Sequence, residues 1–240
     1  MKILITSGGT KIPIDKVRHI ANMSHGTFGS RIAMSALKRG HKVHFLHAKH
    51  SKTPFSLNID AFRDHNIIDL RDRLDEIIDS SENYKDRYSQ SLYETFEDYY
   101  QSLESLILAN RYDAVILAAA VSDYGVENPV NAKIRTAENM SIQLKPLPKI
   151  ISKIKEWDNN IKLVGFKLLV NSEEEELLNE AKKSIQNNKC DMVIANDLRD
   201  IFNDEHQIFI VKPNSIKKYS TDIEDNLYLA RQVIKSLEKL

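Results

Sequence analysis

The opening segment, up to Leu46, constrains the fold most, because it has the pattern of a strand, a glycine-rich turn, a helix and a second strand. Lys2–Thr6 is an apolar, β-branched run that ends in Ser7-Gly8-Gly9-Thr10, which is typical of a buried strand entering a tight turn. Apolar residues then recur at helical spacing from Gly26 to a basic last turn at Arg39-Gly40. This βαβ opening predicts an α/β fold: a Rossmann-like, doubly wound, mostly parallel sheet with helices on both faces.

The rest of the chain continues this alternation. Further strands are predicted at Asp113–Ala120, Ile161–Phe166, Asp191–Ala195 and Gln207–Val211, with helices at Pro148–Trp157, from Glu173 onward and at Ile223–Leu237. Residues 50–66 have no regular pattern. Residues 67–110 carry apolar positions at helical intervals, so one or two amphipathic helices separated near residues 79–86 are expected. A single domain over residues 1–240 is predicted, with a flexible active-site loop around residues 124–140.

Composition excludes several classes of protein. The chain has 240 residues, and its 42% hydrophobic fraction suits a globular core. Its 34 basic and 34 acidic residues give a net charge of zero, which argues against a nucleic-acid partner. The single cysteine excludes a disulfide framework, and the longest apolar run, Ala114–Val121, is too short to span a membrane. We therefore expect a soluble, cytoplasmic protein without a membrane partner.

Four predicted strands end in residues that suit a ligand site. Ligands of open α/β sheets lie beyond the carboxyl ends of the strands. The four strand ends are Gly8-Gly9-Thr10, Ser122-Asp123, Gly165-Phe166-Lys167 and Asn196-Asp197. Each alone is compatible with ordinary turn chemistry, but together they favour a nucleotide or phosphate site. The dinucleotide fingerprint and the Walker phosphate loop are both absent.

Two interpretations of the segment from Asn22 to Gly29 stay open on spacing alone. Backbone N–H groups, with the hydroxyls of Ser24 and Thr27, could hold a phosphate against the positive end of the following helix. Ordinary N-capping by Ser24 or Thr27 explains the same residues equally well.

A metal site and a cysteine nucleophile are both disfavoured. His41, His44, His47 and His50 lie three residues apart, but side chains alternate faces along a strand, so successive histidines should point to opposite sides. No metal ligands are therefore predicted. Cys190 directly precedes an apolar strand and is expected to be a buried packing residue.

The chain resembles phosphopantothenoylcysteine synthetases in a series of blocks that run in family order. The blocks are Ile5–Thr10, Ile14–Asn22, Ser24–Gly29, Ala118–Tyr124, Ala132–Ile134, Leu147–Ile151, Val164–Leu169 and Ala195–Asp197. Each is weak alone, but the ordered set is highly specific. In its Gly-Phe-Lys-Leu-Leu block, and in having no fused flavin-dependent decarboxylase half, the sequence most resembles the monofunctional synthetases of streptococci and enterococci.

The resemblance implies a ligase of coenzyme A biosynthesis. CTP with Mg²⁺ would activate the carboxylate of 4′-phosphopantothenate as an acyl-cytidylate, and cysteine would then displace CMP; no flavin is implied. The family is dimeric, with the pantothenate site completed across the interface, so a homodimer is expected. The alternatives are an ATP-dependent version of the same ligase and a non-catalytic nucleotide-binding homologue. A nicotinamide-dependent dehydrogenase has only a fold analogy to support it.

The resemblance also implies roles for particular residues. Lys133 matches a loop lysine that neutralises phosphate charge, and Asn22 matches an asparagine that contacts the acyl-cytidylate, where an amide can stabilise the developing oxyanion. The implied nucleotide-binding residues are Gly8, Gly9, Thr10, Ala119, Ala120, Asp123, Lys145, Pro148 and Phe166. The implied phosphopantothenate-binding residues are Asn22, Ser24, Gly26 and Gly29.

One departure from the family pattern concerns the triphosphate. Two positions that are commonly basic in the family, on the helix before the Asn-Asp strand, hold Ser184 and Asn188 here. Lys183 and Lys189 each lie one residue away and are weak candidates for the same contacts.

Overall fold

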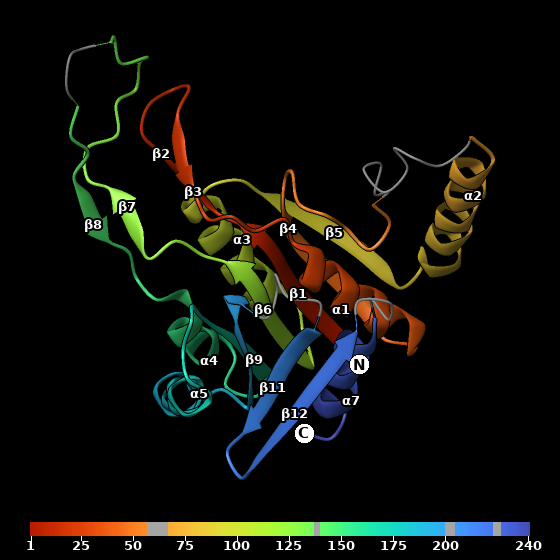
Figure 1. Ribbon diagram of the computed structural model, residues 1–240. Coiled ribbons are helices and arrows are strands. Elements are labelled where there is room, and N and C mark those ends of the chain that lie inside the picture. The colour runs from red at the N-terminus through yellow and green to blue at the C-terminus, as the bar shows by residue number, and fades with distance from the viewer. Residues whose placement is uncertain (57–66, 137–139, 200–204, 223–226) are drawn as a thin grey trace.

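A computed structural model describes residues 1–56, 67–136, 140–199, 205–222 and 227–240 of the chain (Figure 1). Its centre is an eight-stranded sheet with the order β12-β11-β10-β9-β6-β1-β4-β5. Strand β11 pairs antiparallel with β10 and β12, and the other pairings are parallel. The bounds are β1 (Lys2–Gly9), β4 (Lys42–Ala48), β5 (Tyr88–Tyr93), β6 (Ala114–Ala120), β9 (Lys162–Leu169), β10 (Met192–Asp197), β11 (Glu205–Lys212) and β12 (Ser215–Asp222).

Helices cover both faces of this sheet, as the sequence predicts. Alternate side chains of β1 enter different cores, Leu4 on one face and Ile3 and Ile5 on the other. The core around Leu4 is completed by α3 (Phe96–Ala109), the 3₁₀ turn η2 (Ile150–Lys153), α4 (Ile154–Trp157) and α5 (Glu174–Asn188). The core around Ile3 and Ile5 is completed by α1 (Thr27–Lys38) and α7 (Tyr228–Leu237). The doubly wound α/β prediction is therefore confirmed.

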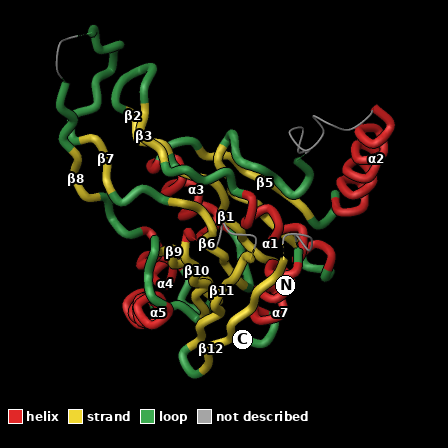
Figure 2. The backbone as a smooth tube through the Cα atoms, in the orientation of Figure 1, coloured by secondary structure: helices red, strands yellow, loops and turns green. Residues whose placement is uncertain are grey.

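Two small hairpins project beyond the carboxyl ends of the parallel strands (Figure 2). In one, β2 (Lys11–Pro13) pairs with β3 (His19–Ala21); in the other, β7 (Tyr124–Val126) pairs with β8 (Leu144–Pro146). Both lie on the same side of the molecule in Figure 1, opposite α2 (Ile67–Tyr84), which stands apart beside β5. The predicted loop at 124–140 thus contains a strand, and residues 137–139 lie outside the described part of the chain.

The prediction for residues 67–110 is wrong in detail. The helix α2 continues through the proposed break to Tyr84, and a strand, β5, replaces the helical start expected at Leu92. The next helix, α3, begins after Thr95, whose hydroxyl accepts from the Asp98 N–H while the Asp98 carboxylate accepts from the Thr95 N–H. That capping box is a start signal readable in the sequence. The start at Thr95 was not predicted, because Leu92 and Phe96 have the four-residue spacing of a helix that begins earlier.

Two further differences lie near the carboxyl end of the chain. Strand β12 was not predicted, because its charged sequence, with Lys217 and Lys218, lacks an apolar run; lysines are typical of the exposed edge strands of a sheet. The predicted helix Ile223–Leu237 begins at Tyr228 in the structure, and residues 223–226 lie outside the described ranges, as do residues 57–66 of the segment expected to be irregular.

Three of the four histidines, His41, His44 and His47, take separate environments, as strand alternation predicts. His47 stacks on Phe45 at a centroid distance of 5.2 Å, whereas His44 hydrogen-bonds to the Ser91 hydroxyl at 2.9 Å. His41 instead contacts the Glu238 carboxylate at 2.8 Å. Within the described residues, no three His, Cys, Asp or Glu side chains form a group that could hold a metal ion.

Cys190 is a buried packing residue, as expected. It is 3% exposed, and burial raises the pKa of its thiol to about 12, so the reactive thiolate is disfavoured at neutral pH. No helix in the described part of the chain is both long and apolar enough to cross a membrane.

Candidate active site

The site is built on the carboxyl ends of β1 and β6, which lie side by side. Gly8 pairs with Ala119 and Gly9 with Ala120 in the parallel register. Just beyond, the Thr10 N–H donates to the Ala120 carbonyl at 3.2 Å. The Thr10 hydroxyl also accepts from the Ser122 N–H at 3.0 Å and lies 3.1 Å from the Ser122 hydroxyl. The structure therefore brings five of the predicted nucleotide-binding residues, Gly8, Gly9, Thr10, Ala119 and Ala120, to one edge.

Glycines allow α1 to begin directly against this edge. An added Cβ at Gly29 would lie 2.7 Å from the Ser7 Cβ, and one at Gly26 would lie 2.8 Å from the Ser7 hydroxyl. Gly26 also has a positive φ of 72°, a conformation that favours glycine. The Ser7 hydroxyl closes this packing by donating to the Gly26 carbonyl at 3.0 Å.

The N-terminus of α1 resolves one alternative left open by the sequence. Gly26 is the N-cap, and no side chain caps the helix. The interpretation of Ser24 or Thr27 as ordinary N-capping residues is therefore wrong. The first N–H groups of α1 start beside Gly8 and Ser7, which is the arrangement that favours an anion at a helix N-terminus.

Asn22 lies on the same edge. It follows β3, and its amide Nδ2 donates to the Ala120 carbonyl at 3.0 Å while the residue remains exposed. Its own carbonyl accepts from the Ser24 N–H at 2.9 Å, and an added Cβ at Gly9 would come within 2.8 Å of that carbonyl. Asn22 is thus held in place by the backbone, with a side chain that solvent or a ligand can reach.

The segment around Lys133 is anchored elsewhere. The Ile134 N–H donates to the Asp15 carboxylate at 3.1 Å, and the Arg18 guanidinium donates to the Ile134 carbonyl at 2.8 Å. Hydrogen bonds from the Arg18 side chain, helped by backbone N–H donors, hold the pKa of the Asp15 carboxyl well below its usual range despite the opposing effect of burial. Lys133 itself is exposed.

Asn22 and Lys133 are therefore not brought together. Asp15 and Arg18 lie in the turn at the far end of the β2–β3 hairpin, whereas Asn22 lies at its base, next to β6. Figure 1 shows the chain between β7 and β8 rising beside this far end. Asp15 and Arg18 were not predicted as positioning residues; an Asp with an Arg three residues on is a readable ion-pair signal.

Asp123 lies beside the predicted base-contacting segment. Its carbonyl accepts from the Leu147 N–H at 2.8 Å, and Gly125 pairs with Lys145 in the β7–β8 hairpin. The Asp123 carboxylate forms an exposed ion pair with Lys149, a residue that the sequence prediction did not select. The structure thus brings Asp123 together with the segment from Lys145 to Pro148.

Phe166, within β9, packs against the first turn of α1. Its ring meets Phe28 edge to face, with centroids 6.0 Å apart and an interplanar angle of 81°. The aromatic pair therefore lies next to the Gly26–Gly29 segment.

The two weak triphosphate candidates lie in different places on α5 and after it. Lys183 is paired with Glu180 at 2.8 Å, and Glu180 also contacts Lys167 at 3.2 Å. Lys189 follows the last turn of α5 and precedes β10, so it lies at the amino-terminal edge of the parallel strands. The structure does not bring Lys189 to the edge that carries Gly8 and Asn22.

Two buried tyrosines, Tyr93 and Tyr99, hydrogen-bond to the carboxyl-terminal half of β1, and they were not predicted from the sequence. The Tyr93 hydroxyl donates to the Ser7 carbonyl at 2.8 Å and the Gly8 carbonyl at 3.0 Å. The Tyr99 hydroxyl donates to the Thr6 hydroxyl at 3.2 Å. Burial raises the pKa of both phenols, so they remain neutral donors. Tyr93 ends the unpredicted strand β5, which explains why no role was assigned to it.

Asp197, at the end of β10, organises a neighbouring loop. It is 2% exposed, and its carboxylate accepts from the Ser172 N–H at 2.7 Å and the Arg199 N–H at 2.8 Å. Burial alone would raise its pKa, but the hydrogen bonds outweigh burial and lower the pKa to about 2. Both carboxylate oxygens of Asp197 therefore already accept hydrogen bonds from backbone N–H groups.

A glycine-rich strand end beside an uncapped helix N-terminus is typical of α/β proteins that bind phosphorylated ligands. The family model of the DNA/pantothenate metabolism flavoprotein C-terminal domain matches residues 1–81 and 89–240. The chain is also 30% identical over 222 residues to phosphopantothenate–cysteine ligase 2 of Oryza sativa subsp. japonica, covering 82% of this chain and 68% of that protein. The chain therefore belongs to the phosphopantothenoylcysteine synthetase family, as its ordered blocks predicted.

Other relatives agree with this assignment. The coenzyme A biosynthesis bifunctional protein CoaBC of Thermococcus kodakarensis is 33% identical over 217 residues, covering 90% of this chain and 46% of that protein. Its counterpart in Methanocaldococcus jannaschii is 26% identical and is covered over 51% of its length. The chain thus spans about half the length of these two relatives. The crystal structure of the DNA/pantothenate metabolism flavoprotein from Streptococcus pneumoniae is 28% identical, with a TM-score of 0.78 over 100% of this chain and 99% of that one.

Proposed function

We propose that this chain is a phosphopantothenate–cysteine ligase that uses CTP. The observation that carries the proposal is the placement of the exposed Asn22 amide, through its hydrogen bond to Ala120, over the edge where the Gly8 turn meets the start of α1. That edge offers backbone N–H groups for a phosphate and an amide donor for an oxyanion within one family framework. CTP rather than ATP is proposed on the family resemblance alone.

The proposed reaction has two steps. In the first, a carboxylate oxygen of 4′-phosphopantothenate attacks the α-phosphorus of the magnesium–CTP substrate, and the bond to the β-phosphate oxygen breaks to release pyrophosphate. In the second, the amine of cysteine attacks the acyl carbon, the carbon–oxygen bond to the phosphate breaks, and CMP leaves with the electron pair while the amine loses its proton. Mg²⁺ enters as part of the nucleotide substrate.

Different residues serve the two steps in this proposal. Lys133 neutralises charge on the phosphates in the first step, which requires its segment to move from the far end of the β2–β3 hairpin toward the edge. Asn22 stabilises the oxyanion that forms on the acyl carbon in the second step. Asp123, Phe166 and the segment from Lys145 to Pro148 contact the nucleotide, and Ser24, Gly26 and Gly29 contact phosphopantothenate.

The test is pyrophosphate release by the full chain with phosphopantothenate, cysteine, Mg²⁺ and either CTP or ATP. Release with CTP supports the proposal, and release with ATP alone replaces CTP by ATP. Absence of release with both nucleotides contradicts the proposal and favours a non-catalytic nucleotide-binding homologue.

Variants separate the two steps. Asn22→Asp should still form the acyl-nucleotide but pass it to cysteine at least about 100-fold more slowly, the scale of losing one oxyanion donor. Lys133→Gln should fail at the first step. The matched controls are Lys16→Gln, an exposed lysine on the neighbouring turn, and Asn214→Asp, in the exposed turn between β11 and β12. Equal loss of both steps in both site variants would contradict the assigned roles.

We also propose that two copies form a homodimer through the hairpin arms. These arms carry exposed apolar side chains, including Val17 (61% exposed), Tyr124 (57%) and Leu144 (48%), which a second copy would cover. Sedimentation should give twice the 27.6 kDa chain mass. Leu144→Asp should reduce that mass, whereas Leu108→Asp, an exposed leucine on α3, should not. A wild-type chain that sediments at the monomer mass would refute the dimer.

A further inference from the structure

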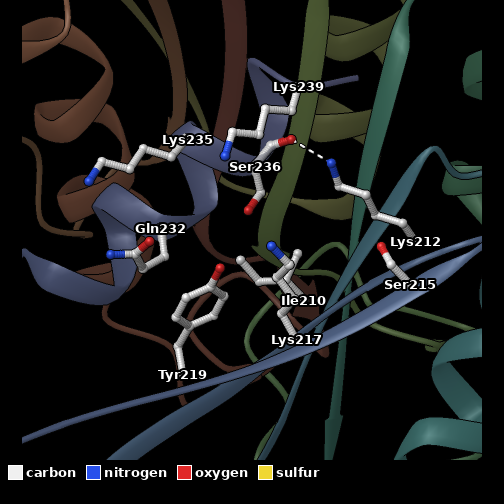
Figure 3. A pocket seen from close by; sticks show the side chains of 9 residues that line it. All are labelled: Ile210, Lys212, Ser215, Lys217, Tyr219, Gln232, Lys235, Ser236 and Lys239. Atoms are coloured by element: carbon white, nitrogen blue, oxygen red, sulfur yellow. Dashed lines mark hydrogen bonds between the residues drawn. The ribbon is translucent and has the colours of Figure 1, made fainter.

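A cavity lies at the edge of the sheet opposite the glycine-rich strand ends. Because β11 runs antiparallel to β10, its final residue, Lys212, lies beside the start of β10. There the β11–β12 hairpin and the end of α7 border a cavity of about 150 Å³ that is partly open to solvent. Its lining includes Lys212, Lys217, Lys235, Lys239, Ser236 and Tyr219 (Figure 3).

The four lysines at this cavity form no salt bridge with a carboxylate of the described residues. Glu238, next to Lys239 in the chain, is engaged by Arg39 and His41. Lys212 donates to the Ser236 carbonyl at 2.7 Å and so caps the end of α7. Burial, followed by repulsion from Lys217, Lys239 and Lys162, lowers the pKa of Lys212. A bound anion would relieve that repulsion.

A serine side chain also lines the cavity. Ser236 is 8% exposed as a whole residue and borders the cavity. Figure 3 shows the Ser236 hydroxyl pointing toward the hydroxyl of Tyr219 and the ammonium group of Lys217, with Lys239 on the other side of Ser236, whereas Lys235 points away. Lysines on an edge strand have a protective role of their own, but that role does not require Lys239, which follows α7, to border the same cavity.

We propose that this cavity binds a small phosphate-bearing anion of about the size of diphosphate. Lys217 and Lys239 neutralise its charge, and the hydroxyls of Ser236 and Tyr219 donate hydrogen bonds to its oxygens. A small anion fits better than a nucleic acid because the donors border one small cavity of about 150 Å³, while the chain as a whole has no net charge. The site is remote from Gly8 and Asn22, so the inference does not depend on the proposed ligase activity.

The first experiment is lysine acylation of the full chain, read by mass spectrometry, with and without inorganic pyrophosphate at constant ionic strength. Lys217 and Lys239 should become at least about threefold less reactive, a fold-change well within what one charge-assisted contact provides. Lys218 is the internal control, because it lies on the same strand as Lys217 but is paired with Glu174 of α5 at 3.0 Å. Equal protection of all three lysines, or of none, would overturn the proposal.

Variants test the same site by binding. A Lys217→Gln/Lys239→Gln double variant should lose the rise in Tm that pyrophosphate produces, with affinity at least about tenfold weaker. Lys218→Gln should retain the rise, and circular dichroism at 25 °C confirms that both variants fold. Loss of the rise in Lys218→Gln as well, or protection of Lys217 and Lys239 by an RNA oligonucleotide but not by pyrophosphate, would refute a small-anion site.

Discussion

Tyr93 is the side chain on which the shape of the glycine-rich end of β1 is expected to depend. Its hydroxyl is buried, with the residue 2% exposed, and donates to the carbonyls of Ser7 and Gly8. Tyr93→Phe keeps the ring but leaves both carbonyls without this donor. At about 0.5–1.5 kcal/mol for each net hydrogen bond, the free energy of unfolding should fall by about 1–3 kcal/mol.

The assay is urea unfolding followed by circular dichroism, with the slope m expected to remain unchanged. A loss near 2 kcal/mol corresponds to a fall in Tm of roughly 4–8 °C for a chain of this size. Tyr88→Phe is the matched control, because the Tyr88 hydroxyl, on the same strand, donates to an exposed Gln90 side chain. Equal, small losses in the two variants would refute the role given to Tyr93.

Three further predictions concern the surroundings of the site. Gly29→Ala should destabilise the chain by about 1–3 kcal/mol in urea unfolding, because the new methyl group overlaps Ser7; no loss would show that α1 shifts freely. Asp197→Asn should lower the free energy of unfolding at pH 7. The difference in this free energy between variant and wild type should narrow as the pH falls from about 4, the pKa of an unfolded Asp, toward about 2, the pKa of Asp197 in the folded chain. A difference that is constant with pH would contradict a charged Asp197 carboxylate. Asp15→Asn should speed proteolytic cleavage beside Ile134, which a limited-digestion time course would detect; unchanged cleavage would refute the tether.

Strands that are uniformly apolar, and the turns between them, could be predicted from the sequence. β1, β6 and β10 are buried on both faces, so their side chains form continuous apolar runs. Strands β5 and β12 could not be found in the same way, because each carries polar residues on an exposed face. Their positions depend on pairing with β4 and β11, which is a tertiary effect that a local pattern does not contain.

In the candidate site too, features set by local sequence could be predicted and features set by tertiary contacts could not. Gly8, Gly9 and Asn22 could be proposed as site residues because the strand–turn–helix order and the family blocks fix their place in the chain. The contact of Tyr93 with Ser7 and Gly8 and the anchoring of Ile134 by Asp15 and Arg18 were not predicted, because each joins residues far apart in the sequence. The separation of Asn22 from Lys133 could not be predicted either, since it depends on where the hairpin arms project.

The central claim is that the carboxylate is activated on the α-phosphate of CTP, and oxygen labelling tests this directly. Phosphopantothenate labelled with ¹⁸O in its carboxylate is incubated with the chain, cysteine and magnesium–CTP, and the products are weighed by mass spectrometry. Because the attacking oxygen stays on phosphorus when the acyl carbon–oxygen bond breaks, one labelled oxygen should appear in CMP. Label in pyrophosphate or inorganic phosphate, with none in CMP, would contradict the account.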